Sequence, residues 1–256
     1  MTADFAALAE RLDTAAQAGK ATPQISLEHD LSEEDAYAIQ ALSIARRLER
    51  GEQRVGIKMG LTSRAKMRQV GVHEVIWGQL TDAMRIEDGG SLDFGRYVHP
   101  RVEPEVAFVL KSRIDRPLSP AEVWAHVGGV APALEVIDSR YENFKFALPD
   151  VIADNSSSSS FVVGPWSAPT EDVDNLGLVL TFDGAERQFG STSAILGHPA
   201  RSLAAASRLV TQRGLALEPG WIVLAGGATA AEHLRPGVSV GLEMQRLGRA
   251  GFRVEG

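Results

Sequence analysis

Residues 102–110 read Val102-Glu103-Pro104-Glu105-Val106-Ala107-Phe108-Val109-Leu110, an apolar run that predicts a buried β-strand. A second apolar run, residues 130–137, carries Glu135. Side chains alternate across a strand, so Glu103 and Glu105 project to one face, about 6.5 Å apart. A buried carboxylate is costly without a cation or dense hydrogen bonding, and neither run contains Lys or Arg. A bound divalent cation would explain all three glutamates and predicts an enzyme.

The residues alone leave a second interpretation of these glutamates open. A Glu-x-Glu pair is also typical of a strand face that is exposed to water. Glu135 shares its segment with Asp138 and Arg140, which could pair with each other at the surface. If a metal does bind, the six histidines show no ligand spacing, and an all-oxygen site favours Mg²⁺ or Mn²⁺ over zinc or copper.

Composition bounds the class of protein. The chain has 256 residues, of which 44% are hydrophobic and 23% charged, as expected for a globular protein of one or two domains. A net charge of −7 argues against a nucleic-acid partner, which would favour a basic face. The absence of cysteine excludes disulfides, zinc–thiolate sites and thiol nucleophiles. No signal-peptide pattern or apolar run of membrane-spanning length is present, so we expect a cytoplasmic protein without a membrane partner.

The N-terminal part of the chain has helical apolar spacing. We predict helices over 3–18 and 32–49, the second capped by Ser32 with Asp35 three residues on, and a strand over 55–61. Thr62 or Ser63 could cap a further helix through about Val70. We therefore expect a mainly helical part, residues 1–70.

From about residue 76, short strands alternate with turn signals. Asp183-Gly184 between two strand-like runs predicts a hairpin, and residues 238–254 predict a terminal hairpin. One late helix is expected over about 199–213. Residues 71–256 are thus predicted to form a larger β-rich domain.

Lys58 and Arg140 are candidates for contact with a substrate, each with a plainer alternative. Lys58 lies mid-strand between Gly56 and Gly60. Buried beside a metal it would have a lowered pKa and could donate a proton; the alternative is a strand-edge Lys with an exposed head. Arg140 could clamp a carboxylate through two hydrogen bonds, or form a surface salt bridge.

Two polar segments follow. Residues 154–160 read Asp154-Asn155-Ser156-Ser157-Ser158-Ser159-Ser160, a composition that favours a flexible linker, although apolar runs on both sides allow a hydroxyl-rich pocket wall. Gly226-Gly227-Ala228-Thr229 follows a predicted strand at 221–224; a plain turn is favoured there over a backbone site for anions.

Four motifs in order carry a resemblance to a known family. They are Gly56-Ile57-Lys58-Met59-Gly60-Leu61-Thr62-Ser63, Glu103-Pro104-Glu105, Leu134-Glu135-Val136-Ile137-Asp138-Ser139-Arg140 and Ile152-Ala153-Asp154-Asn155-Ser156. The ordered set resembles the hydratase/decarboxylase branch of the fumarylacetoacetate hydrolase superfamily over nearly the whole chain. Residues 63–67 and 138–146 look more like the decarboxylases of that branch than the hydratases.

The resemblance implies a fold and a site. The fold would be α+β, a mixed β-roll of the fumarylacetoacetate hydrolase type with a small helical N-terminal part. The metal, Mg²⁺ or Mn²⁺, would be held by Glu103, Glu105 and Glu135. Catalytic roles are implied for Lys58, Asp82 and Asp138, and substrate contacts for Leu61, Arg140, Asn155, Ser156, Ser157 and Thr229.

The resemblance also implies a reaction and partners. The reaction would be metal-dependent decarboxylation of (3E)-2-oxohex-3-enedioate to 2-hydroxypenta-2,4-dienoate and CO₂, in the meta-cleavage route of aromatic degradation. Hydration of the dienoate product, or a non-catalytic partner subunit, are the alternatives. The expected partners are a small 2-oxo dicarboxylate, further copies of this chain in a homo-oligomer, and a 2-oxopent-4-enoate hydratase.

Overall fold

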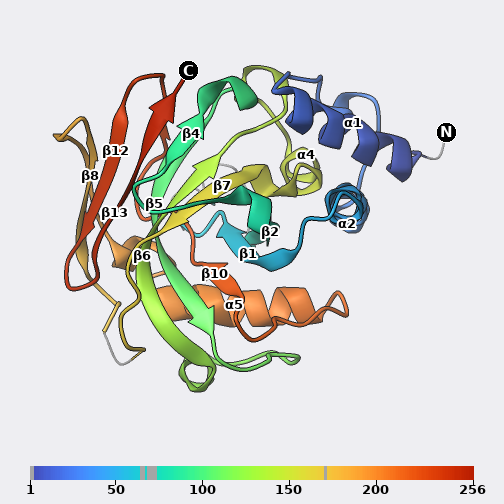
Figure 1. The fold of residues 1–256 in the computed structure, drawn as a ribbon. Helices are drawn as coiled ribbons and strands as arrows, with labels where there is room; N and C mark the ends of the chain where they lie inside the picture. Colours follow the sequence, from blue (N-terminus) through green and yellow to red (C-terminus); the bar gives the residue numbers. More distant parts are fainter. Residues whose placement is uncertain (1–2, 64–66, 68–73, 170–171) are drawn as a thin grey trace.

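The computed structural model describes residues 3–63, 67, 74–169 and 172–256 as a mixture of helices and two sheets (Figure 1). The larger sheet has eight strands and mixes parallel with antiparallel pairs. Its spatial order is β2 (Ile76–Thr81), β1 (Arg54–Gly60), β10 (Ile222–Leu224), β5 (Arg101–Leu110), β6 (Val127–Ile137), β7 (Ser158–Val163) and β3 (Arg85–Ile86), with β11 (Glu232–His233) paired to β5.

The smaller sheet lies beside the long strands β5 and β6 (Figure 1). Its five strands, in spatial order, are β4 (Ser91–Asp93), β13 (Gly248–Glu255), β12 (Ser239–Met244), β8 (Gly177–Phe182) and β9 (Ala185–Ser191). Strands β12 and β13 contact β6, so the two sheets share one apolar core. Alternating buried and exposed positions along β12 and β13 show that only one face of this sheet is covered.

Helices cover the other sides of the large sheet (Figure 1). Helix α1 (Phe5–Ala18) packs on α2 (Glu33–Glu49), which packs on the short α4 (Leu148–Ala153), while α5 (Pro199–Thr211) contacts the 3-10 helix at Glu122–Ala125. Local chemistry defines the ends of the first two. Asp4 accepts hydrogen bonds from the first turn of α1, and Ser32 and Asp35 form the predicted capping box of α2.

Most of the predicted elements are confirmed. The helices at 3–18, 32–49 and 199–213, the strand at 55–61, and both hairpins are present with ends shifted by a few residues. The β8–β9 turn uses Asp183 and Gly184 in left-handed conformations, as that hairpin type requires. The helix expected from Thr62 or Ser63 to Val70 falls largely outside the described residues. The division of the chain at residue 70 stays a prediction; β1, which precedes it, belongs to the large sheet.

The interpretation of residues 154–160 as a flexible linker is wrong. Asn155, Ser156 and Ser157 form a buried turn, and β7 begins at Ser158 inside the large sheet. The apolar run before the tract is helix α4, not a strand. Composition misleads here because the tract is fixed by contacts with distant segments, such as the hydrogen bond that the Ser156 hydroxyl donates to the Trp77 carbonyl, which a count of serines cannot reveal.

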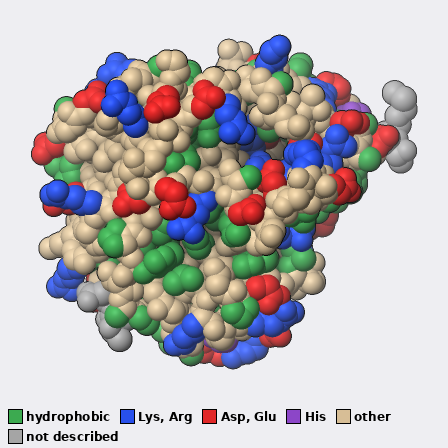
Figure 2. All heavy atoms as spheres, in the orientation of Figure 1, with side chains coloured by type: hydrophobic (Ala, Val, Ile, Leu, Met, Phe, Trp, Pro, Cys, Tyr) green, Lys and Arg blue, Asp and Glu red, His purple; other side chains and the backbone are tan. Residues whose placement is uncertain are grey.

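The surface charge and the character of the helices concern binding to nucleic acids and membranes. On the face drawn in Figure 2, Lys and Arg side chains are interspersed with Asp and Glu side chains. Within the described ranges, none of the helices combines the length and the apolar character needed to cross a membrane.

Candidate metal centre and cavity

The three predicted glutamates meet on two neighbouring strands. Strands β5 and β6 are antiparallel, and their register sets Glu103 directly opposite Glu135, with Glu105 opposite Ala133. One carboxylate oxygen from each glutamate lies within 4.8 Å of the other two. Glu105 and Glu135 are both fully buried, so the interpretation of a water-exposed strand face is wrong.

The buried carboxylates lack sufficient hydrogen bonds. Glu105 Oε2 accepts a 2.6 Å hydrogen bond from the Gly226 amide, but Glu105 Oε1 and both oxygens of Glu135 have no hydrogen-bond partner among the described residues. Burial raises the pKa of Glu105 well above its usual range, and the neighbouring carboxylates of Glu135 and Glu103 raise it further. Burial likewise raises the pKa of Glu135. An oxygen-rich, negatively charged site with free lone pairs fits a divalent cation.

Lys58 lies beside this cluster. Its Nζ is 3.0 Å from Glu135 Oε2 and donates a 3.0 Å hydrogen bond to the carbonyl of Ser156. The contact with Glu135 is an ion pair, and the other carboxylate oxygen, Glu135 Oε1, has no hydrogen-bond partner among the described residues. Lys58 is 3% exposed on a strand flanked by β2 and β10, which rules out the strand-edge alternative.

Without a metal, the neighbouring carboxylates control the pKa of Lys58; the lowered pKa expected beside a bound metal stays a prediction. Burial lowers the pKa of the ammonium, but the charges of Glu135, Glu105 and Glu103 outweigh it and raise the pKa. Lys58 therefore holds its proton firmly in the metal-free protein. A cation among the three carboxylates would offset part of their charge and weaken this effect.

The turn at Asn155–Ser157 presents groups to the cavity through a left-handed backbone. The φ angles of Asn155, Ser156 and Ser157 are 51°, 52° and 59°, a costly conformation for residues other than glycine. The Asn155 side chain bonds both backbone groups of Gln79, at 2.7 and 2.9 Å, which anchors the turn to β2. Ser157 Oγ is buried, without a hydrogen-bond partner in the described part of the chain.

A cavity of about 710 Å³ opens onto this centre. One end is polar, formed by Lys58, Glu103, Ser156 and Ser157. The rest of the wall is largely apolar and includes Leu61, Ile76, Ile137, Phe144, Phe146, Leu148 and Val151. Polar groups converging at one end of an apolar pocket are typical of a small-molecule site.

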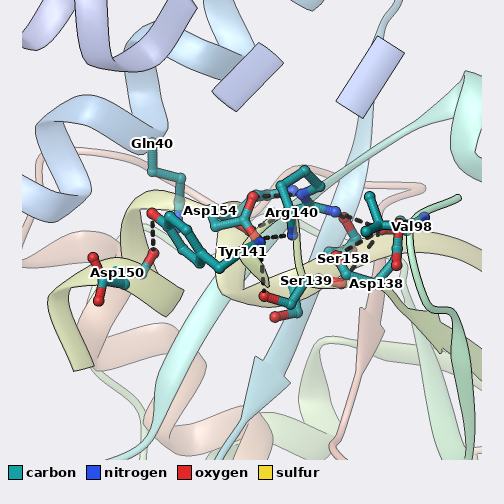
Figure 3. Close-up of polar contacts among 12 residues, drawn as sticks. Gln40, Val98, Asp138, Ser139, Arg140, Tyr141, Asp150, Asp154 and Ser158 are labelled. Carbon is teal, nitrogen blue, oxygen red and sulfur yellow. Dashed lines mark hydrogen bonds and ion pairs between the residues drawn. The ribbon is translucent and has the colours of Figure 1, made fainter. Parts of the chain in front are cut away.

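Asp138, expected to be catalytic, and Arg140, expected to contact substrate, do not line the cavity in the described structure. The Asp138 carboxylate accepts hydrogen bonds from the backbone amides of Val98 and His99, at 2.9 and 2.8 Å. Arg140 is 5% exposed and forms an ion pair with the buried Asp154, as the network in Figure 3 shows. The guanidinium donors of Arg140 are thus occupied inside the fold and cannot clamp a ligand.

Asp82 and Thr229 also lie outside the cavity lining. Asp82 is exposed at the far end of β2 and accepts a 2.9 Å hydrogen bond from the Gln53 amide, so the structure does not bring it to the cavity, and its catalytic role stays a prediction. Thr229 is half-exposed and bonds the carbonyl of Ala230, although Gly227, Ala230 and Ala231 around it do line the cavity. The turn before it holds a carboxylate, since the Gly226 amide donates to Glu105.

Among the cavity residues that the sequence did not predict, Arg101 and Phe144 form a pair. Arg101 precedes Glu103 by two residues on the same strand, so strand alternation alone could have placed it on the glutamate face. Phe144 stacks on Arg101 from a segment far along the chain, and no local signal predicts that contact.

Comparison with known proteins agrees with this geometry. Residues 66–255 match the family model described as fumarylacetoacetate (FAA) hydrolase C-terminal. The chain is 55% identical over 249 residues, 97% of both chains, to a 4-oxalocrotonate decarboxylase of Pseudomonas sp. It is 36% identical over 199 residues, 76% of this chain and 90% of the other, to a 2-hydroxypent-2,4-dienoate hydratase of Pseudomonas putida.

Among the solved structures, this chain is again similar to a 4-oxalocrotonate decarboxylase. A 4-oxalocrotonate decarboxylase from Pseudomonas putida G7, complexed with magnesium and adipate, matches with a TM-score of 0.95 at 37% identity, covering 98% of this chain and 97% of the other. The match confirms the expected α+β fold, a mixed β-roll with a small helical N-terminal part.

Proposed function

Because the chain belongs to the fumarylacetoacetate hydrolase family, we propose that it decarboxylates (3E)-2-oxohex-3-enedioate, or 4-oxalocrotonate, to 2-hydroxypenta-2,4-dienoate and CO₂. The observation that carries the proposal is the buried Glu103–Glu105–Glu135 cluster beside Lys58, at the polar end of a cavity, in a chain 55% identical to a decarboxylase of that name. The reaction would belong to the meta-cleavage degradation of aromatic compounds.

The three glutamates would hold Mg²⁺ or Mn²⁺, in line with the oxygen-only donor set and with the magnesium of the related decarboxylase structure. Bound there, the ion would supply Lewis-acid stabilisation for the negative charge that develops on the 2-oxo oxygen of the substrate. Among the described residues, Glu105 Oε1 and Glu135 Oε1 have no hydrogen-bond partner, and these buried oxygens are the feature that supports the assignment.

The chemistry needs no organic cofactor because the substrate is its own electron sink. The bond between C5 and C6 breaks, CO₂ leaves, and the electron pair is delocalised through C4 and C3 onto the 2-oxo oxygen. Lys58 Nζ would donate a hydrogen bond and then a proton to that oxygen, giving the 2-hydroxy dienoate. The Ser157 hydroxyl would donate a hydrogen bond to the 2-oxo acid end, while Leu61 and the apolar wall exclude water.

A product assay tests the proposal. Purified protein given 2-oxohex-3-enedioate should release CO₂ with Mg²⁺ present and stop when EDTA is added. Undiminished release in metal-free buffer would overturn the metal-dependent mechanism. Protein given 2-hydroxypenta-2,4-dienoate should leave it unchanged, whereas conversion to 4-hydroxy-2-oxopentanoate would identify the hydratase instead.

The wider assembly is part of the same proposal. We expect a homo-oligomer and a complex with a 2-oxopent-4-enoate hydratase, in the cytoplasm. Light scattering after size exclusion, alone and with the hydratase, measures both states. Association without any metal-dependent turnover would favour the alternative of a non-catalytic partner subunit.

A further inference from the structure

Arg101 ends the strand face that carries the metal-binding carboxylates. Arg101, Glu103 and Glu105 alternate on β5 and therefore share a face, which runs from the fully buried Glu105 to the partly exposed Glu103 and Arg101. Arg101 lies opposite Ile137, one pair further along the ladder than Glu103 and Glu135. Two residues of strand separate Arg101 from Glu103, about 6.6 Å, a distance that an extended six-carbon diacid can bridge.

The guanidinium of Arg101 is held in place by an aromatic ring, and Glu103 is the carboxylate whose charge acts on it. The guanidinium stacks over the ring of Phe144, with Cζ 3.7 Å from the ring centroid. Its Nε is buried and, among the described residues, has no hydrogen-bond partner. Arg101 itself lines the cavity, and a partly buried guanidinium there is suited to bind a carboxylate.

The surroundings of Phe144 keep this arrangement rigid. Phe144 and the preceding Asn143 both have left-handed backbones, with φ angles of 55° and 60°. Phe144 also packs on His99 and Phe146, at ring distances of 5.2 and 5.6 Å. A non-glycine residue is strained in this conformation, which surrounding contacts must stabilise. The aromatic packing lowers the local dielectric and strengthens a charge pair at Arg101.

The other cation in the described cavity lining has a different task. Lys58 is engaged by Glu135 and by the carbonyl of Ser156 at the metal end. We propose that Arg101 binds the distal carboxylate of the substrate and makes the enzyme specific for diacids. This inference rests on the proposed function, since it assumes that the 2-oxo acid end lies at the glutamates.

The position predicts a particular kinetic role. In a 2-oxohex-3-enedioate bound this way, the distal carboxylate is the group lost as CO₂, and its charge diminishes in the transition state. An arginine on that group stabilises bound substrate more than the transition state. Arg101 thus acts on KM and selectivity, and does not accelerate the chemical step.

Equilibrium binding tests the inference independently of turnover. With Mg²⁺-loaded protein, calorimetry should show that adipate binds more tightly than hexanoate, its monoacid counterpart. Arg101→Met should weaken adipate binding by about tenfold or more, the loss of a charge-assisted hydrogen bond, and leave hexanoate binding unchanged. Arg96→Met, at an exposed arginine outside the cavity lining, is the matched control and should change neither affinity. Equal adipate binding by wild type and Arg101→Met would overturn the inference.

Kinetics on 2-oxohex-3-enedioate give the second readout. Arg101→Met should raise KM by about tenfold or more, with kcat unchanged or higher. The KM of Arg101→Lys should lie between those of Arg101→Met and wild type. A lower kcat at unchanged KM would contradict the assigned role. Failure of the wild type to release CO₂ would refute the proposed function alone, because the adipate measurement still decides whether Arg101 recognises a diacid.

Discussion

Glu103 lies directly opposite Glu135 across β5 and β6, in an antiparallel register that continues without interruption from Arg101 to Val109. Like charges directly opposite each other destabilise a sheet. Glu105 adds a third carboxylate within 4.8 Å. In the described structure, Lys58 forms an ion pair with Glu135. The metal-free fold therefore carries an electrostatic cost that a divalent cation relieves.

Glu105→Gln should separate metal binding from folding. Mg²⁺ at a hundred times its wild-type Kd should stabilise wild type by ~2.7 kcal/mol and the variant by well under ~1 kcal/mol, measured by thermal unfolding. Without metal the variant should be at least as stable as wild type, because a buried charge has been removed. Glu87→Gln, an exposed glutamate, is the control. Full Mg²⁺ stabilisation of Glu105→Gln would refute the site.

Lys58→Met should remove the proton donor while preserving the cavity. We expect kcat for CO₂ release to fall by ~10²–10⁴-fold, the usual contribution of a positioned acid. Mg²⁺ binding, measured by calorimetry, should persist or tighten because Glu135 loses a competing cation. The exposed Lys111→Met is the control. A kcat within about tenfold of wild type would exclude Lys58 from the proton transfer.

Arg140→Met should be a stability variant. Removing the guanidinium leaves the buried Asp154 uncompensated, and we expect a loss of ~3–5 kcal/mol in the free energy of unfolding by urea. Arg249→Met, at an exposed ion pair, should cost less than ~1 kcal/mol. The KM of the folded Arg140 variant should equal that of wild type. An unchanged stability with a raised KM would restore Arg140 to the substrate site.

Gly227→Ala should weaken metal binding by displacing the carboxylate of Glu103. A Cβ at this position would lie 2.8 Å from Glu103 Cδ and force the carboxylate to move. Mg²⁺ affinity should fall by about tenfold or more, while the metal-free protein loses less than ~1 kcal/mol because only the end of a side chain shifts. Gly177→Ala, with no heavy atom closer than 3.8 Å, is the control. Equal Mg²⁺ affinities in the two variants would contradict this account.

Asp13→Asn should change the acid stability of the helical part. Arg50 donates two 2.7 Å hydrogen bonds to Asp13 and Arg46 a third. Burial raises the pKa of Asp13, but the two arginines outweigh it and hold the pKa below 3.8. A carboxyl group whose pKa is lowered by folding stabilises the fold at pH values above its pKa in the unfolded chain. This stabilisation is lost as the pH falls through its pKa in the folded protein.

The Asp13→Asn variant should therefore lose about 2 kcal/mol at neutral pH, measured by urea unfolding. The difference from wild type should persist down to about pH 4 and shrink below it. A difference that stays constant at lower pH would show that packing, not charge, accounts for the loss.

Local patterns predicted the elements well. The capping box at Ser32 and Asp35 and the hairpin at Asp183 form between residues adjacent in sequence, so their chemistry is visible in the chain. Alternation likewise placed Glu103 and Glu105 on one face of β5. The same rule applied two residues earlier would have included Arg101.

Long-range pairing could not be predicted from such patterns. Arg140 was expected to contact substrate, yet it bonds Asp154, whereas Arg101 faces the cavity. Both arginines lie close in sequence to a glutamate of the cluster: Arg101 precedes Glu103, and Arg140 follows Glu135. Burial and partners on other elements distinguish them, because a guanidinium surrounded by hydrogen-bond acceptors is neutralised inside the fold.

The chain alone thus determined which strands carry carboxylates, because side-chain direction in a strand follows from backbone geometry. Only the tertiary structure decided that Glu135 faces Glu103, that the serine tract turns inward against β2, and that Arg101 lines the cavity. Each of these depends on register and packing between segments far apart in sequence, where burial of the whole sheet outweighs local preference.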